Sequence, residues 1–250
     1  MFISPIQSNP AVYSEKVVYR HGEVQLEGYL AYDKARPEQR PGILVVHEWW
    51  GINDYVKRRA DQLAQLGYVA FALDMYGKGK TTDDPDEAAQ LSSVYKNDPD
   101  LARARLGAGL EQLQQLHPVK KTSLAAIGYC FGGKMVLELA RSGAPLKGVV
   151  CFHGGLSTTQ PSGSGEIKAK VLVLHGADDP VEPISELRGF HQEMLQAGVD
   201  WQVIIYGGVM HSFTNPAADR VGIEGIRYNE KVDRRAWQAM LGFFGEIFSA

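Results

Sequence analysis

The chain is 250 residues long, with 44% hydrophobic and 22% charged residues and a formal net charge of −3. This near-neutral balance gives no reason to expect a nucleic acid or an acidic membrane surface as a partner, and no apolar run approaches the ~20 residues of a membrane helix. The two cysteines, Cys130 and Cys151, do not indicate a disulfide framework, and the N-terminus lacks the pattern of a signal peptide. We therefore expect a soluble, cytoplasmic protein.

Apolar and polar residues alternate in the first part of the chain. Residues 15–20 and 23–31 show the period of two that is typical of half-buried strands, and His21 and Gly22 form a turn signal between them. The sequence therefore predicts an opening antiparallel hairpin. From residue 43 onwards, wholly apolar strands alternate with amphipathic segments. The expected strands are residues 43–46, 68–73, 124–127, 148–152, 171–174 and 201–206, and the expected helices are residues 55–66, 101–116, 134–141, 184–197 and 228–248.

Strands that are covered on both faces and alternate with helices predict an α/β fold with a mostly parallel central sheet and helices on both faces. Residues 81–100 are polar and only weakly helical, and the glycine- and serine-rich residues 154–165 indicate a flexible surface loop. The basic run 57–59 is expected on a solvated helix face. No stretch is long enough for a separate cap domain, so we expect a single domain spanning residues 1–250.

A glycine-flanked cysteine stands between the expected strand 124–127 and the helix that follows it. The segment Gly128-Tyr-Cys130-Phe-Gly132 has the form Gly-x-nucleophile-x-Gly, with cysteine where serine is usual. Such a strand-to-helix turn lifts the nucleophile above the sheet. It also directs the side chain toward the helix N-terminus, whose partial positive charge favours the reactive thiolate. Most free cysteines are buried small hydrophobes, so this interpretation depends on the rest of the chain.

An acidic segment follows the expected strand 171–174, where loops of open α/β sheets build sites. A carboxylate there could orient a histidine. Asp178 and Asp179 compete for this role, and Asp179, which precedes Pro180, is the favoured candidate. Asp178 is then a turn residue.

His211 is the candidate general base, because it follows the last expected strand in a glycine-rich loop and imidazole titrates near neutrality. His47, His153 and His175 also end apolar strands and are rivals by position. Chain order favours His211, since α/β hydrolases present the nucleophile, the acid and the histidine in that sequence.

The loop after the first central strand, His47-Glu48-Trp49-Trp50-Gly51, is the place from which such hydrolases take one backbone N–H of the oxyanion hole; the residue after the nucleophile gives the other. These donors would be Trp49 and Phe131. Glu48 is unusual, since an unpaired carboxylate in an apolar pocket is costly, and a functional role for it is favoured.

The strand-to-helix turn at residues 128–132 is called the elbow below. The chain resembles the dienelactone hydrolase family over roughly its whole length, because it combines a cysteine in the elbow with Glu48, Asp179 and His211. The resemblance implies an α/β-hydrolase fold and a triad of Cys130, Asp179 and His211. It also implies that Glu48 holds the resting thiol neutral and helps to deprotonate it when substrate displaces the glutamate. The namesake enzymes clamp a substrate carboxylate with arginines, whereas this chain has Thr214 and Asn215 after Phe213 and lysines in the loop after Leu73.

The sequence therefore predicts an ester or lactone hydrolase that forms an acyl-enzyme and acts on a small organic substrate other than dienelactone itself. Candidate pocket residues are Trp50, Tyr76, Lys78, Tyr129 and Phe213. Alternatives are a thioesterase or acyl transferase on the same triad, a cysteine-based redox or stress protein, and a non-catalytic binding module. No cofactor and no metal are expected, because neither a phosphate loop nor metal-ligand spacing is present. A monomer is the default expectation, with a homodimer as the alternative.

Overall fold

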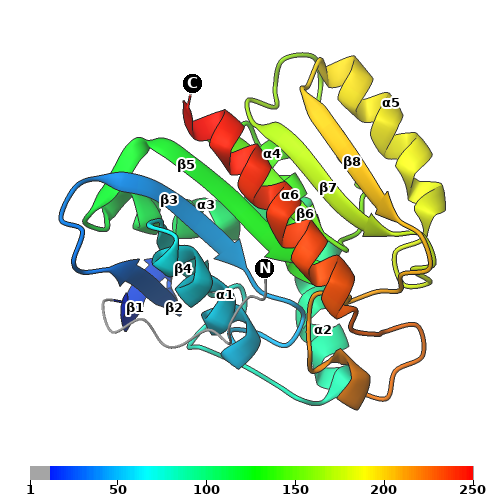
Figure 1. Ribbon diagram of the computed structural model, residues 1–250, viewed down its shortest axis with the longest axis horizontal. Helices are drawn as coiled ribbons and strands as arrows, with labels where there is room; N and C mark the ends of the chain where they lie inside the picture. The colour runs from blue at the N-terminus through cyan, green and yellow to red at the C-terminus, as the bar shows by residue number, and fades with distance from the viewer. Residues whose placement is uncertain (1–11, 250) are drawn as a thin grey trace.

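The computed structural model describes residues 12–249, which form one eight-stranded sheet with helices packed on both faces (Figure 1). The N-terminal stretch, in which no signal peptide is expected, lies outside the described residues. Across the sheet the strands lie in the order β1-β2-β4-β3-β5-β6-β7-β8. The strands are β1 (Val12–His21), β2 (Val24–Asp33), β3 (Arg40–Val46), β4 (Val69–Leu73), β5 (Val119–Tyr129), β6 (Gly148–Phe152), β7 (Lys170–Gly176) and β8 (Trp201–Tyr206).

The sheet is mixed, as the sequence predicts. The opening hairpin, β1 with β2, is antiparallel and its second strand joins the sheet antiparallel to β4. From β4 to β8 every pairing is parallel. The carboxyl ends of these parallel strands therefore meet at one edge, where α/β sheets build their sites.

Two groups of helices cover the two faces of the sheet (Figure 1). Buried residues of α1 and α6 belong to one apolar cluster, and buried residues of α3, α4 and α5 belong to the other. Within residues 12–249, no helix is both long enough and apolar enough to cross a membrane. The helices are α1 (Asp54–Gln65), α2 (Pro85–Lys96), α3 (Pro99–Gln115), α4 (Phe131–Arg141), α5 (Leu187–Ala197) and α6 (Glu230–Ser249), with short 3-10 turns η1 (Ile184–Glu186) and η2 (Ala218–Arg220).

The weakly patterned residues 81–100 contain a regular helix, α2. Its start is fixed locally, because the Asp84 side chain accepts hydrogen bonds from the backbone N–H groups of Asp86 and Glu87. Pro85 then occupies the first helical position, where its missing N–H costs nothing. These capping residues, rather than an apolar stripe, explain the helix.

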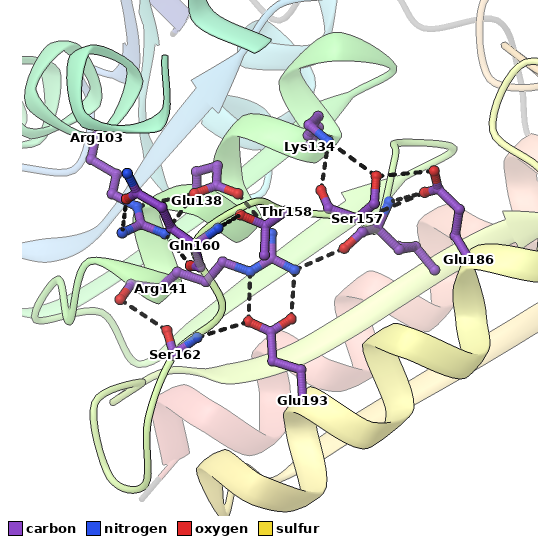
Figure 2. A network of polar contacts seen from close by, with 11 residues as sticks. Arg103, Lys134, Glu138, Arg141, Ser157, Thr158, Gln160, Ser162, Glu186 and Glu193 are labelled. Carbon is purple, nitrogen blue, oxygen red and sulfur yellow. Dashed lines mark hydrogen bonds and ion pairs between the residues drawn. The ribbon is translucent and has the colours of Figure 1, made fainter. Parts of the chain in front are cut away.

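The segment 154–165 is not the flexible loop that its composition indicates. Figure 2 shows it held by side chains of three helices. From α4, Arg141 donates to the carbonyl oxygen of Leu156 at 2.8 Å and forms two hydrogen bonds with Glu193 of α5. The Glu193 carboxylate in turn accepts the Ser162 N–H at 3.1 Å. Arg103 of α3 binds the carbonyl oxygen of Gln160 at 2.8 Å.

The sequence predicts that the basic run 57–59 lies on a solvated helix face, and this is wrong for Arg59. Arg59 is only 6% exposed, and its Nη2 donates to the carbonyl oxygen of Thr214 at 2.7 Å and to Asp233 of α6 at 2.5 Å. Arg58 is exposed and Lys57 is half-buried. The helical period explains the difference, because the third residue of the run turns toward α6.

Candidate active site

The nucleophile candidate lies at the tight turn between β5 and α4. Cys130 has φ 54° and ψ −118°, a conformation that non-glycine residues rarely adopt. The flanking glycines are required by close backbone contacts. A Cβ at Gly128 would collide with the carbonyl of Gly132, and one at Gly132 would collide with the carbonyl of Val46. The turn therefore seats the start of α4 directly against the end of β3.

Three side chains from three separate loops meet at this turn. His211, after β8, places Nε2 3.0 Å from Sγ of Cys130. Its Nδ1 lies 2.8 Å from Oδ2 of Asp179, after β7. All three side chains are buried, with Cys130 9% exposed and His211 1% exposed. A thiol, an imidazole and a carboxylate in this order can transfer a proton away from sulfur.

Of the two competing aspartates, the structure places Asp179 against His211. Its other oxygen, Oδ1, accepts the backbone N–H groups of Val181 and Glu182, both at 2.9 Å. These two bonds fix the carboxylate, so that Oδ2 is directed at the imidazole. Asp178 is exposed at the surface of the turn.

The charge state of His211 is set by its neighbours. Burial alone would lower the pKa of its imidazole, but the charge of Cys130 and the hydrogen bonds to Asp179 and Cys130 outweigh burial and raise that pKa well above its usual value. The protonated form of His211 is therefore favoured in its place between the Cys130 sulfur and the Asp179 carboxylate.

Two backbone N–H groups, those of Trp49 and Phe131, are the predicted oxyanion donors. Phe131 begins α4, so its N–H has no partner within the helix, and among the described residues no acceptor is found for the N–H of Trp49. The peptide group that joins Glu48 to Trp49 is held at its carbonyl oxygen. His47 Nε2 accepts the Met75 N–H at 3.3 Å, which puts the ring proton on Nδ1, and Nδ1 lies 2.5 Å from the carbonyl oxygen of Glu48. Because the peptide is planar, this directs the Trp49 N–H the opposite way.

Glu48 is buried at the same edge of the sheet, but it does not bond to Cys130. Its Oε2 accepts the Asn215 amide at 2.6 Å and its Oε1 accepts the Ser212 hydroxyl at 3.3 Å. Burial raises the pKa of the Glu48 carboxyl, and the Asn215 hydrogen bond opposes that rise. The carboxylate is thus tied to the loop that carries His211.

The five pocket candidates are not all in one place. Tyr76 is half-buried, its ring centroid lies 5.9 Å from that of Phe131, and its hydroxyl donates to the carbonyl oxygen of Trp49 at 2.9 Å. Trp50 is 8% exposed and packs against Trp49. Lys78 is an exposed residue of the loop after β4.

The prediction that Tyr129 and Phe213 line the substrate pocket is wrong. Both side chains lie in the core on the α1/α6 face and neither is accessible. Tyr129 stacks on Phe152 with its centroid 4.7 Å away. It precedes Cys130 by one residue, and alternation along the strand turns it to the opposite face.

Sequence reasoning placed His153 only among the rivals of His211, and it gave no role to Thr214, Tyr55 or Arg59. The structure joins these four residues in a buried series of hydrogen bonds that reaches the Cys130 backbone. The one sequence feature that could have indicated a role for His153 is its position, because it directly follows the strand that pairs with the strand leading into the elbow.

Strained backbone is concentrated at the site. Of the four non-glycine residues with positive φ in the described chain, three belong to it: Cys130 (54°), His153 (40°) and Ser212 (55°); the fourth is Lys78. Such conformations persist only where the surroundings enforce them, and they gather at functional sites. Within residues 12–249, no group of three or more His, Cys, Asp or Glu side chains is arranged so that it could hold a metal ion.

Comparison with known proteins shows the family to which this fold belongs. The family model of the dienelactone hydrolase family matches residues 26–248. A solved structure, the dienelactone hydrolase-like promiscuous phosphotriesterase P91 from metagenomic libraries, is 38% identical, with a TM-score of 0.90 over 95% of this chain and 99% of that one. Protein usf of Aquifex pyrophilus is 28% identical over 94% of this chain and 99% of its own length. The "Putative carboxymethylenebutenolidase" of Aquifex aeolicus is 27% identical over 92% of this chain and 97% of its own length.

Proposed function

This chain belongs to the dienelactone hydrolase family, and from that premise we propose that it hydrolyses small esters or lactones through an acyl-enzyme on Cys130. The observation that carries the proposal is the contact pair of His211, 3.0 Å from the sulfur of Cys130 and 2.8 Å from the carboxylate of Asp179. Each atom needed to create a thiolate and to hold an imidazolium is already within hydrogen-bond reach.

In the first half-reaction, the Cys130 sulfur attacks the substrate carbonyl carbon and its proton resides on His211 Nε2. The carbonyl oxygen becomes an oxyanion and accepts the N–H groups of Trp49 and Phe131. When the tetrahedral adduct collapses, the bond to the leaving oxygen breaks and His211 protonates that oxygen. The products are an alcohol and a thioester on Cys130.

In the second half-reaction, His211 takes a proton from water, and the resulting hydroxide attacks the thioester carbonyl. The same two N–H groups receive the second oxyanion. Collapse releases the carboxylic acid and returns the thiolate, while Asp179 keeps His211 in one orientation and stabilises its positive charge. For a lactone, the leaving oxygen stays attached to the released acid.

Glu48 is proposed as a second carboxylate that acts on the resting thiol. It lies in the loop that carries the Trp49 N–H, and burial raises its pKa, so it can carry a proton more readily than a surface glutamate. In the described geometry it is bound to Ser212 and Asn215. Its proposed role therefore requires that it exchange these bonds for Cys130 before substrate binds.

The experiment that tests the function is hydrolysis of p-nitrophenyl acetate by the wild type, by Cys130→Ala and by wild type treated with iodoacetamide. We expect turnover in the untreated wild type only, and Cys130→Ser should keep only weak activity because the site is matched to a thiol. Unchanged turnover in Cys130→Ala would remove the mechanism.

The chain offers an internal control for alkylation. Cys151 is fully buried, and burial raises the pKa of its thiol to about 12. It should therefore stay unmodified while Cys130 reacts, and mass spectrometry of the treated protein should find one adduct. Rapid alkylation without any ester turnover would instead favour the redox alternative.

A phosphotriester is a second candidate substrate, favoured by the 38% identity to the promiscuous phosphotriesterase P91. A thiolate beside two N–H donors can attack phosphorus as well as carbon, since the phosphoryl oxygen also gains charge. Release of p-nitrophenol from paraoxon by the wild type but not by Cys130→Ala would support it. Identical rates with and without Cys130 would exclude it.

A further inference from the structure

The side chain of His153 forms a hydrogen bond with the backbone of Cys130. It follows β6, it is fully buried, and its Nδ1 accepts the backbone N–H of Cys130 at 3.1 Å. The same N–H also lies 3.0 Å from the carbonyl oxygen of Phe152. The elbow is thus held by two acceptors on the neighbouring strand end, one of them a side chain.

The tautomer of His153 follows from these contacts. Because Nδ1 accepts an N–H, the ring proton is on Nε2, and Nε2 donates to the hydroxyl oxygen of Thr214 at 2.7 Å. Burial and the nearby charge of His211 lower the pKa of His153 well below its usual value. The ring therefore stays neutral and keeps its acceptor directed at Cys130.

The series of bonds continues to two helices on the α1/α6 face. The hydroxyls of Thr214 and Tyr55 lie 2.6 Å apart, and Arg59 binds the carbonyl oxygen of Thr214 as well as Asp233 of α6. Each member is buried or nearly so, and each polar bond fixes the next. The ring of His153 cannot rotate without breaking this series.

His153 also limits the position of the general base. Its ring meets that of His211 edge to face, with centroids 5.2 Å apart. One side chain therefore contacts both partners of the 3.0 Å contact between Cys130 and His211. A shift of about 1 Å in such a contact can cost about 100-fold in rate.

We propose that His153 is a positioning residue for the hydrolytic reaction, in which its Nδ1 acceptor holds the Cys130 backbone at positive φ and thereby keeps the sulfur aligned with His211. This inference rests on the proposed function, because the nucleophile is the same. The proposal concerns the acceptor atom and not only the volume of the ring.

Three substitutions of His153 separate the effect of its acceptor atom from the effects of its backbone conformation and its side-chain volume. His153→Asn puts Oδ1 where Nδ1 was, and asparagine tolerates positive φ. His153→Gly also tolerates it but has no acceptor. His153→Leu fills most of the volume and has no acceptor. We expect kcat on p-nitrophenyl acetate to fall about 10- to 100-fold in the glycine and leucine variants, with KM within about 2-fold, and to stay within about 3-fold in the asparagine variant.

A second measurement does not depend on ester turnover. The rate of Cys130 alkylation by iodoacetamide at pH 6 should fall in the glycine and leucine variants and be restored in the asparagine variant. If the wild type shows no turnover, the proposed function fails, and these rates still decide the role of His153. The proposal would be overturned if all three variants lost alkylation rate equally. It would also be overturned if the loss of rate simply tracked the fall in each variant's thermal unfolding midpoint.

Thr214→Val keeps the proposal testable if the His153 variants do not fold. It removes the acceptor for Nε2 but leaves Nδ1 in place, so the ring loses its anchor. We expect a several-fold fall in kcat with KM unchanged. Wild-type kcat in this variant would overturn the claim that the anchored ring positions Cys130.

Discussion

At the scale of single residues, the pairing of His211 with Cys130 has a direct consequence for pH dependence. The pKa of His211 is raised well above its usual value, so its imidazolium persists at pH values where a free histidine (pKa ~6.5) is neutral. Stability from this pair is fully present below ~6.5, and it is lost as the pH rises through the folded value.

Alkylation of Cys130 by iodoacetamide should therefore remain fast between pH 6 and 8 in the wild type. In His211→Gln the sulfur loses its cation, and the rate should fall about 10-fold per pH unit below ~8, as for an ordinary thiol. His191→Gln, which changes an exposed histidine of α5, is the control and should keep the wild-type profile. Superimposable profiles for the wild type and His211→Gln would contradict the pairing.

The two adjacent aspartates make a matched pair for the acid. Asp179→Asn should lower kcat by about 100- to 10,000-fold, because His211 loses the carboxylate that fixes its tautomer and stabilises its charge. Asp178→Asn changes an exposed residue and should stay within about 2-fold. Steady-state kinetics on one ester substrate compares them, and a larger loss in Asp178→Asn would reverse the assignment.

At the scale of elements, the buried side chain of Arg141 pairs with a glutamate of its own helix, α4, and with one of α5. Arg141, 3% exposed, contacts Glu138 at 3.0 Å and Glu193 at 2.8 Å, and Figure 2 shows it between the two carboxylates. Arg141→Met would leave both carboxylates buried without this cation. Breaking a buried pair in this way costs about 3–5 kcal/mol.

Urea unfolding should show this loss as a lower midpoint. Lys170→Met is the control, because Lys170 pairs with Asp200 and Glu246 at the surface, where ion pairs contribute little. A midpoint for Arg141→Met equal to that of Lys170→Met would show that the pairs do not hold the helices together.

The sequence predicted elements best where burial imposes a strict period. The apolar strands β6 and β7 and the amphipathic helix α1 lie where the pattern indicated. It was weak or wrong where a few polar bonds decide the structure. Asp84 begins α2 in a segment with little apolar pattern, and Arg141 holds a loop whose glycines and serines indicate mobility. Such bonds join residues far apart in sequence, which local pattern cannot reveal.

The candidate site divides in the same way. Cys130, Asp179 and His211 were predicted because motif and chain order mark them, and the structure brings them together. Tyr129 was misplaced because an aromatic residue next to a nucleophile suits both a pocket and the core. The anchoring role of His153 depends on a contact with a backbone N–H, and no residue pattern records it.

At the scale of the whole molecule, we propose that residues 1–250 form a single domain. All eight strands of the described residues belong to one sheet. Tryptophans lie in separate parts of the molecule: Trp49 and Trp50 beyond β3, Trp201 on β8 and Trp237 on α6. Urea unfolding followed by tryptophan fluorescence and by far-UV circular dichroism should give coincident transitions. Two resolved transitions would contradict the proposal. The monomeric state remains a prediction.

The distance along the chain between the reacting groups also affects how the protein is made. His211 follows Cys130 by 81 residues and Asp179 by 32. A ribosome therefore exposes the proposed nucleophile well before it synthesises the proposed base. Until β8 has been added and the last loop has closed, Cys130 lacks its contact with His211, so the proposed triad is first complete in a nearly finished molecule.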